Sequence, residues 1–137
     1  MVEQRKKVVL DTNLFVAAFW NRRSASARII ERALEGEFDV CYTPQMRAEL
    51  GLVLRKIRVA QPYVERVGRL FDEAVCVEGR PAPVYTEDRE DQKFLECAVA
   101  ADADYVITSD EHLLRLKRVG NTAILTPTRF VKEARSR

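Results

Sequence analysis

A short apolar run that ends in an acid constrains the fold more than any other stretch of this chain. The run Val8-Val9-Leu10 leads directly into Asp11. Consecutive bulky or β-branched apolar residues are typical of a parallel strand whose two faces are both covered. In open α/β sheets, ligands bind at the carboxyl ends of such strands. We therefore predict a buried strand over residues 7–11, with the Asp11 carboxylate at the ligand-binding edge of a sheet.

Strand-like and helix-like segments alternate along the remainder of the chain. Further short apolar runs predict strands at residues 38–42, 74–77, 105–108 and 122–125. Helices are predicted over residues 13–20, 63–71, 89–101, 111–116 and 127 onward. A further helix starts at Ser24 or Ser26 and runs to residue 35. Another starts at residue 44, and Gln61-Pro62 ends or kinks that helix. Thr43-Pro44 and Thr126-Pro127 are typical helix starts, because a capping hydroxyl precedes proline at the first helical position. This alternation predicts an α/β fold, a three-layer α/β/α sandwich with a parallel sheet of about five strands.

The composition indicates one globular domain spanning residues 1–137. Hydrophobic residues make up 47% of the chain and charged residues 32%, which excludes a disordered chain. The net charge of +2 neither requires nor excludes a nucleic-acid partner, because local clustering of charge decides that. No segment approaches the ~20 apolar residues of a membrane span, so no membrane partner is expected.

The cysteines and the histidine bear on the redox environment and on the class of metal. Cys41, Cys76 and Cys97 are odd in number and lie in apolar contexts, so we expect buried free thiols and a cytoplasmic protein. His112 is the one histidine, and no two cysteines are closely spaced, which argues against a zinc site.

Acids occur at strand ends and along apolar helix faces. Asp11 ends the first predicted strand, and Asp110 follows the fourth, two residues after Thr108. The carboxyl ends of central parallel strands meet at one edge of the sheet, so both acids are expected there. Glu49 borders the apolar face of the third predicted helix, and Asp91 lies in the first turn of the helix over 89–101, in phase with its apolar face.

Four acids in one place need a positive counter-charge. Unpaired carboxylates in a partly buried site repel one another and are costly to desolvate. A divalent cation removes that cost, and Mg²⁺ or Mn²⁺ prefers oxygen ligands and keeps several waters. Such an ion can activate water and neutralise charge on a phosphoryl group. The sequence therefore predicts a metal site formed by Asp11, Glu49, Asp91 and Asp110.

Taken singly, these acids also have simpler explanations. Asp91 suits a helix N-terminus because of the helix dipole, and Asp110 suits the capping position of the following helix. Glu49 fits a solvent-facing helix surface. Asp11 is the hardest to explain in this way, because a charged group that ends a buried strand needs a partner.

Beyond the acids, an ordered set of motifs resembles the PIN-domain family. The set comprises Val8-Val9-Leu10-Asp11-Thr12-Asn13, the acid Glu49, Asp91-Gln92-Lys93-Phe94-Leu95-Glu96-Cys97-Ala98, Ala103-Asp104-Tyr105-Val106-Ile107-Thr108-Ser109-Asp110 and Ile124-Leu125-Thr126-Pro127-Thr128-Arg129-Phe130. No single piece is specific, but the set covers about residues 6–133. The likeness is closest to the bacterial and archaeal toxin components of type II toxin–antitoxin pairs.

What the resemblance implies is a metal-dependent endoribonuclease that hydrolyses RNA phosphodiester bonds. It implies the strand order 3-2-1-4-5 and a Mg²⁺ or Mn²⁺ cofactor. By motif, the family's acids map onto Asp11, Glu49, Asp91 and Asp110, and its polar helpers onto Asn13, Thr108 and Ser109. A small antitoxin is the implied protein partner, and a homodimer or higher oligomer is left open.

The third motif departs from the family pattern. The run from Asp88 to Gln92 contains Glu90 and a glutamine where further aspartates are usual. Asp91 keeps the better helix phase. Asp88, Glu90 and Glu96 stay open as further contributors to the site. The family often has a glycine before the last acid, where this chain has a serine.

Cations near the predicted site are candidate contacts to substrate phosphates. They are Arg22, Arg23, Arg28, Arg47, Lys93, Arg115, Lys117 and Arg118, although a solvated charged face would contain the same residues. Phe19 and Trp20 have the flat rings that stack on bases, but we assign them to core or dimer contacts.

Two other classes of function fit part of the pattern. A phosphoacceptor or phosphatase-like doubly wound domain would use Asp11 as a nucleophile. Against it, Asn13 stands at the place of a second acid, and no lysine ends the fifth predicted strand. A non-catalytic PIN-like partner-binding module would have no need of the complete set of four acids.

Overall fold

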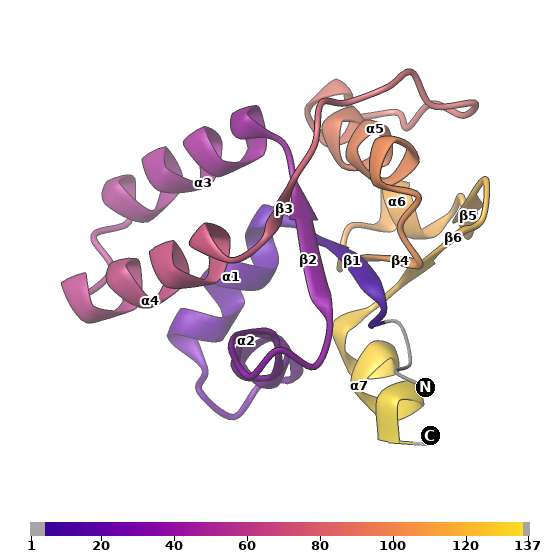
Figure 1. Cartoon of the computed structure of the whole chain (residues 1–137). Coiled ribbons are helices and arrows are strands. Elements are labelled where there is room, and N and C mark those ends of the chain that lie inside the picture. The colour runs from indigo at the N-terminus through magenta and orange to yellow at the C-terminus, as the bar shows by residue number, and fades with distance from the viewer. Residues whose placement is uncertain (1–4, 136–137) are drawn as a thin grey trace.

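A central sheet with helices on both sides makes up the described part of the chain (Figure 1). The computed structural model describes residues 5–135. The strands are β1 (Lys7–Leu10), β2 (Asp39–Tyr42), β3 (Val75–Cys76), β4 (Tyr105–Ile107), β5 (Arg118–Val119) and β6 (Thr122–Leu125). The helices are α1 (Thr12–Trp20), α2 (Ala25–Leu34), α3 (Pro44–Lys56), α4 (Gln61–Asp72), α5 (Gln92–Ala101), α6 (Glu111–Leu114) and α7 (Pro127–Arg135), with a 3₁₀ turn, η1 (Arg89–Asp91), before α5. Within residues 5–135, each helix is too short or not apolar enough to cross a membrane.

β1 lies inside the sheet, whose strand order is β3-β2-β1-β4-β6-β5. It pairs in parallel with β2 and β4, with Leu10 opposite Ile107, and β6 pairs in parallel with β4. The predicted α/β fold and strand order are confirmed, with β6 as the fifth predicted strand. β5 was not predicted. It is a two-residue strand antiparallel to β6, and the turn between them has φ +56° at Gly120, which glycine adopts readily.

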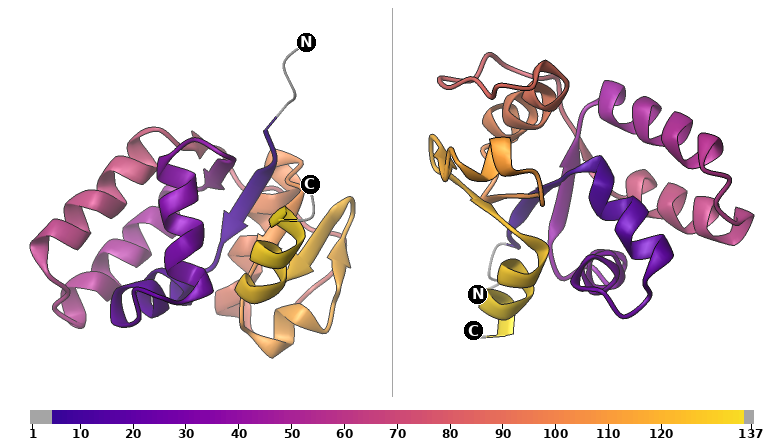
Figure 2. Two further views of the ribbon diagram at one scale, coloured as in Figure 1. Left: turned by 90° about the horizontal axis from the view of Figure 1, so that it is seen from below. Right: turned by 180° about the vertical axis from the view of Figure 1, so that it is seen from behind.

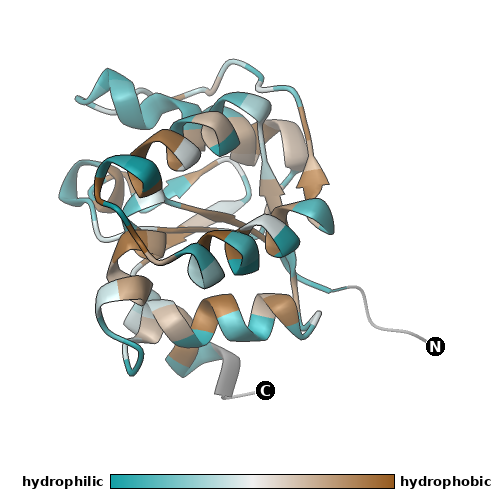
Figure 3. Cartoon of the chain, turned by 90° about the vertical axis from the view of Figure 1, so that its left-hand side faces the viewer, coloured by the Kyte–Doolittle hydropathy of each residue, from teal (hydrophilic) through white to brown (hydrophobic). Residues whose placement is uncertain are grey.

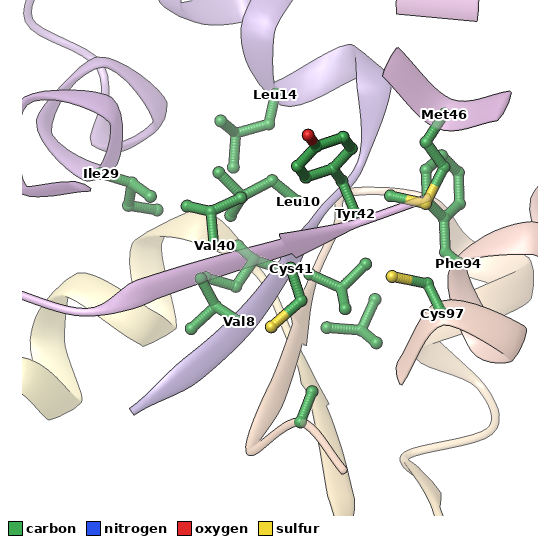
Figure 4. Packing of buried hydrophobic residues seen from close by; sticks show 14 of the residues in the cluster. Val8, Leu10, Leu14, Ile29, Val40, Cys41, Tyr42, Met46, Phe94 and Cys97 are labelled. Carbon is green, nitrogen blue, oxygen red and sulfur yellow. The ribbon is translucent and has the colours of Figure 1, made fainter. Parts of the chain in front are cut away.

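Apolar side chains fill the space on both faces of the sheet. Val8 and Val9 are fully buried, as expected for a strand covered on both sides. Helix α5 contacts β1, β2 and β4, whereas α2 lies against α1 and α7 (Figure 2). Figure 4 shows Leu14 and Ile29 on one side of β2 and Cys97 of α5 on the other. The strands are mostly apolar and the outward helix faces mostly polar (Figure 3).

Two helix boundaries differ from the sequence-based prediction. Helix α3 ends at Lys56, and Pro62 lies in the first turn of α4 instead of ending or kinking the helix before it. Proline suits a first turn because the N–H groups there have no helical partner. The predicted helix over 89–101 is divided, since residues 89–91 form η1 and α5 begins at Gln92.

One cysteine also differs from the prediction. Cys41 and Cys97 are buried free thiols, but Cys76 is exposed. β3 contains only two residues, forms an edge of the sheet and is exposed at both positions. Burial raises the pKa of the Cys41 thiol to about 11 and that of Cys97 to about 12, so both stay protonated at neutral pH.

Candidate metal centre

Asp11 occupies the junction between β1 and α1, where the central strand ends. Its side chain is only 3% exposed, and both carboxylate oxygens are held. Oδ1 accepts a hydrogen bond from the backbone N–H of Asn13 at 3.1 Å, which caps α1, and Oδ2 accepts one from the Thr108 hydroxyl at 2.5 Å. Burial raises the pKa of Asp11, and these two hydrogen bonds oppose that rise.

Thr108 links the ends of the two central strands. Its hydroxyl donates to Asp11 and accepts a hydrogen bond from the backbone N–H of Asp110 at 3.0 Å. Asp110 in turn caps α6, because its Oδ1 accepts from the backbone N–H of His112 at 2.8 Å. The expectation that Asp11 and Asp110 meet at one edge of the sheet is therefore correct. Both residues also act as helix caps, so the simple explanation of Asp110 holds as well.

The start of α5 adds two more carboxylates to this edge. Asp88, Asp91 and Asp110 each offer an oxygen, and these three oxygens lie within 4.8 Å of one another. Asp88 caps η1 by accepting from the backbone N–H of Glu90 at 2.9 Å. Asp88 and Asp91 lie three residues apart, and the 3₁₀ turn between them brings their carboxylates together.

Asp91 has the most unusual environment of these acids. Its pKa is raised to about 7, first by burial and then by hydrogen bonding and charge repulsion with Asp110. The hydrogen bond with Asp91 in turn lowers the pKa of Asp110. Within the described residues, Asp91 Oδ2 is buried and has no hydrogen-bond partner. A buried oxygen without a donor is costly unless a cation or proton compensates it.

The donor set fits a hard divalent cation. Three carboxylate oxygens converge, one of the three acids also has a buried oxygen without a donor, and no sulfur or imidazole atom belongs to the group. Mg²⁺ and Mn²⁺ prefer such all-oxygen surroundings. Asp91 and Asp110, with Asp88 beside them, are thus placed to hold an ion. Asp11 lies close enough to raise the pKa of Asp91 through its charge.

Glu49 lines the same cleft but not the same group of oxygens. The cleft has a volume of about 390 Å³ and is lined by Asp11, Thr12, Asn13, Glu49, Leu52, Val53, Glu90, Asp91, Lys93 and Phe94. In it, Glu49 Oε2 lies 2.5 Å from the Lys93 ammonium, and Oε1 accepts from the Gln45 amide at 3.1 Å. The ammonium lowers the pKa of Glu49. Glu49 thus lies beside the acids that the sequence grouped with it, whereas its role as a metal ligand stays a prediction.

The other predicted site residues fall in different places. Asn13 is exposed and lines the cleft, and its backbone N–H holds Asp11. Ser109 is exposed and does not belong to the residues lining that cleft. Glu90 lines the cleft, while Glu96 lines a neighbouring pocket of about 500 Å³ that shares Glu49, Glu90 and Lys93 with it.

Among the candidate phosphate-binding cations, Lys93 lies inside the cleft. Arg47 forms an ion pair with Asp72 at 2.9 Å, and Arg115 one with Glu87 at 3.4 Å. Lys93 is therefore the cation best placed to act with the acids. Its signal in the sequence is its position two residues after Asp91.

The aromatic pair expected to lie in the core or a dimer contact is only partly buried. Trp20 is 67% exposed at the end of α1, so the core assignment is wrong for that residue. Phe19 packs edge-on against Trp20 and lies against the Tyr63 ring. Trp20 is the last residue of α1.

These observations define a class of protein: an α/β domain with a carboxylate-rich site at the carboxyl edge of a mostly parallel sheet. The chain belongs to the PIN-domain family, since the model of that family matches residues 7–112, and the resemblance seen in the motifs is confirmed. No curated protein sequence matches the chain.

A solved structure has the same fold. It is the crystal structure of VapBC2 from Rickettsia felis bound to a DNA fragment from their promoter. A chain of that structure superposes with a TM-score of 0.56, covering 88% of this chain and 98% of the other, at 14% sequence identity. At this identity the likeness supports the fold alone.

Proposed function

We propose that this protein is a metal-dependent ribonuclease that hydrolyses RNA phosphodiester bonds, and that it is the toxin of a toxin–antitoxin pair. The observation that carries the proposal is the group of carboxylate oxygens from Asp88, Asp91 and Asp110, with Asp91 Oδ2 buried and lacking a donor, and with Asp11 joined to Asp110 through the Thr108 hydroxyl. Membership of the PIN-domain family supports it, because PIN domains are generally nucleases. The resemblance of the motif set to toxin components of type II toxin–antitoxin pairs supports an antitoxin partner.

In this proposal, Asp91, Asp110 and Asp11 hold Mg²⁺ or Mn²⁺, with Asp88 beside them. When bound, the cation supplies the positive charge that activates water and neutralises the phosphodiester. Thr108 and the backbone N–H of Asn13 keep the Asp11 carboxylate in one orientation. Asp91 must release its proton before its carboxylate can face a cation, because ligand oxygens bind metal in the charged form.

Exchanging the buried acid at the end of β1 tests the proposal. Asp11→Asn keeps the size and the ability to cap α1 but removes the negative charge. We expect loss of Mn²⁺-dependent cleavage of single-stranded RNA by more than about 100-fold, since the charge stabilisation at stake is several kcal/mol. The measurement is cleavage of a fluorogenic RNA with and without chelator, and circular dichroism checks the fold.

Asp102→Asn is the matched control. Asp102 is exposed at the end of α5 and has φ +50°, a conformation that asparagine tolerates. The control should cleave as the wild type does. Cleavage by Asp11→Asn at the wild-type rate would refute the ribonuclease proposal.

The same assays distinguish the two other classes of function. A phosphoacceptor domain would form an aspartyl phosphate at Asp11 after treatment with a phosphodonor. Its burial, at 3% exposure, and its two hydrogen bonds favour a fixed ligand over a nucleophile. A non-catalytic module would bind partner or RNA without any chelator-sensitive cleavage.

A further inference from the structure

A lysine lies within the acidic cleft, between two carboxylates from different elements. The Lys93 ammonium lies 2.5 Å from Glu49 Oε2 on α3 and 3.9 Å from Glu90 Oε2 on η1. The Lys93 side chain is only 12% exposed, and its ammonium lies 5.2 Å from the centre of the Phe94 ring. Of the described residues that line the cleft, Lys93 alone carries a positive charge.

Both oxygens of Glu49 are already engaged. Oε1 accepts from Gln45 and Oε2 pairs with Lys93, so the carboxylate has its counter-charge without a metal ion. Asp91, by contrast, has a buried oxygen without a donor. The two ends of the cleft therefore differ: the aspartate end needs a cation, and the Glu49 end already contains one.

The carboxylates of an acidic cleft repel the negative charge of a phosphodiester. A positive side chain in the cleft can offset this repulsion. A lysine ammonium carries three N–H donors and acts as a compact charge. Glu49 uses one donor of Lys93, which leaves donors for phosphate oxygens. Lys93 also lines the neighbouring pocket that contains Tyr85 and Arg89.

We propose that Lys93 binds a substrate phosphate next to the metal-binding aspartates, and that Glu49 positions Lys93 instead of binding the metal. The inference rests on the proposed ribonuclease function and assigns a different role to one of its four acids. In this arrangement Glu49 is a positioning residue, because it acts through the lysine.

The first experiment measures metal binding without RNA. Isothermal titration with Mn²⁺ should give a dissociation constant for Glu49→Gln within about twofold of the wild type, because the variant removes no ligand. Asp91→Asn should weaken binding by at least about tenfold, since it removes a charged ligand. Weakening of tenfold or more in Glu49→Gln would overturn the role assigned to Glu49.

The second experiment measures the contact with phosphate. For Lys93→Gln we expect the KM for a single-stranded RNA to rise about tenfold, as for a lost charged hydrogen bond, with kcat within about threefold. The slope of log KM against log salt concentration should fall by about 0.7, the value for one phosphate contact on a single strand. Lys93→Arg keeps the charge and should restore the salt slope.

Arg69→Gln is the charge-matched control, because Arg69 is an exposed cation on α4. It should leave KM and the salt slope unchanged. A Lys93→Gln variant with unchanged KM and salt slope would overturn the role assigned to Lys93. Thermal melts of every variant exclude an effect through unfolding.

Failure of the proposed function has a different signature. In that case the wild type does not cleave RNA with Mn²⁺, or Asp11→Asn cleaves as well as the wild type. Fluorescence anisotropy of a labelled single-stranded RNA still tests Lys93 then, through the affinity and salt slope of Lys93→Gln against Arg69→Gln. Equal values in those two variants would overturn the inference by themselves.

Discussion

At the scale of single residues, Asp91 and Asp110 form a pair with opposite acidities. Burial and its neighbour raise the pKa of Asp91 to about 7, whereas the hydrogen bond from Asp91 lowers that of Asp110. The pair thus binds a proton in the metal-free protein at a pH where exposed aspartates have lost theirs. A divalent cation must displace that proton, so metal affinity should rise with pH up to about 7.

The stability of the metal-free protein should also depend on the protonation of Asp91. Unfolded Asp91 loses its proton near pH 3.8, but native Asp91 keeps it to about pH 7, so its favourable contribution is lost as the pH rises through that window. The Asp91→Asn substitution removes the titrating group, so the variant does not lose stability in this way as the pH rises. With chelator present, we expect the variant to melt a few degrees above the wild type at pH 8 and at the same temperature at pH 4.

Differential scanning calorimetry at both pH values provides the measurement. Asp102→Asn serves again as control, because Asp102 is an exposed acid at the other end of α5 and should show no such pH-dependent difference. A variant that melts below the wild type at pH 8 would show that the native site favours the charged form of Asp91.

The sequence predicted those site residues whose placement follows from strand ends. Asp11 and Asp110 follow neighbouring parallel strands, and that rule alone brings them together. It could not show which partner each carboxylate has. The helix phase of Glu49 placed it beside the apolar face of α3. It could not show the Lys93 contact, because Lys93 belongs to another helix and only tertiary packing joins the two.

At the scale of elements, the loop between β3 and η1 is held by one side chain of α5. Gln92 Oε1 accepts from the Thr86 N–H at 2.9 Å, and its Nε2 donates to the Val84 carbonyl at 3.0 Å. These two hydrogen bonds of the Gln92 side chain fix the chain just before Asp88. Without them, two partly buried backbone groups would have no partner.

We expect Gln92→Ala to destabilise the protein by about 1–3 kcal/mol, the cost of buried polar groups left unpaired. Limited proteolysis with mass mapping should show faster cleavage within residues 77–88. Gln61→Ala, at an exposed glutamine that begins α4, is the control. Equal cleavage rates in the two variants would mean that side-chain packing, and not the hydrogen bonds of Gln92, holds the loop in place.

Element types were predictable where capping chemistry is explicit. Thr43-Pro44 and Thr126-Pro127 begin α3 and α7 as predicted. The boundary at Pro62 was misassigned, because proline both follows helices and starts them, and sequence alone does not say which. β5 escaped prediction because two residues are too few to show a periodic pattern; its pairing depends on β6 lying beside it.

At the scale of the whole molecule, the proposed metal site connects two halves of the chain that are distant in sequence. Asp11 lies near the start of the chain, while Asp91 and Asp110 come from its second half. A cation bound by all three would favour the folded chain, because the unfolded chain does not hold these acids together. Metal binding should therefore raise the unfolding temperature.

Millimolar Mn²⁺ should raise the wild-type Tm by several degrees, since a concentration about 100 times the Kd adds about 2.7 kcal/mol. Asp11→Asn and Asp91→Asn should lose most of this shift. Differential scanning fluorimetry with and without Mn²⁺ is the measurement, with Ca²⁺ and Na⁺ at matched ionic strength as controls. Equal shifts in wild type and both variants would place the stabilising ion elsewhere on the protein.

The overall architecture was the most predictable level. Alternation of apolar strands with amphipathic helices dictates a parallel sheet, and the apolar run Val8-Val9-Leu10 in the first strand dictates an interior position. The additional strand and the exposure of Cys76 lie at the two edges of that sheet, where few neighbours constrain the chain.

Two of the acids at the site also cap the α-helices that follow them, and this ties the spacing of the carboxylates to helix position. Asp11 caps α1 and Asp110 caps α6, with the Thr108 hydroxyl between them. A tilt of either helix would carry its carboxylate along. A protein that binds α1 and tilts it would therefore change the spacing of the carboxylates. Such a partner would inhibit the site without blocking the cleft.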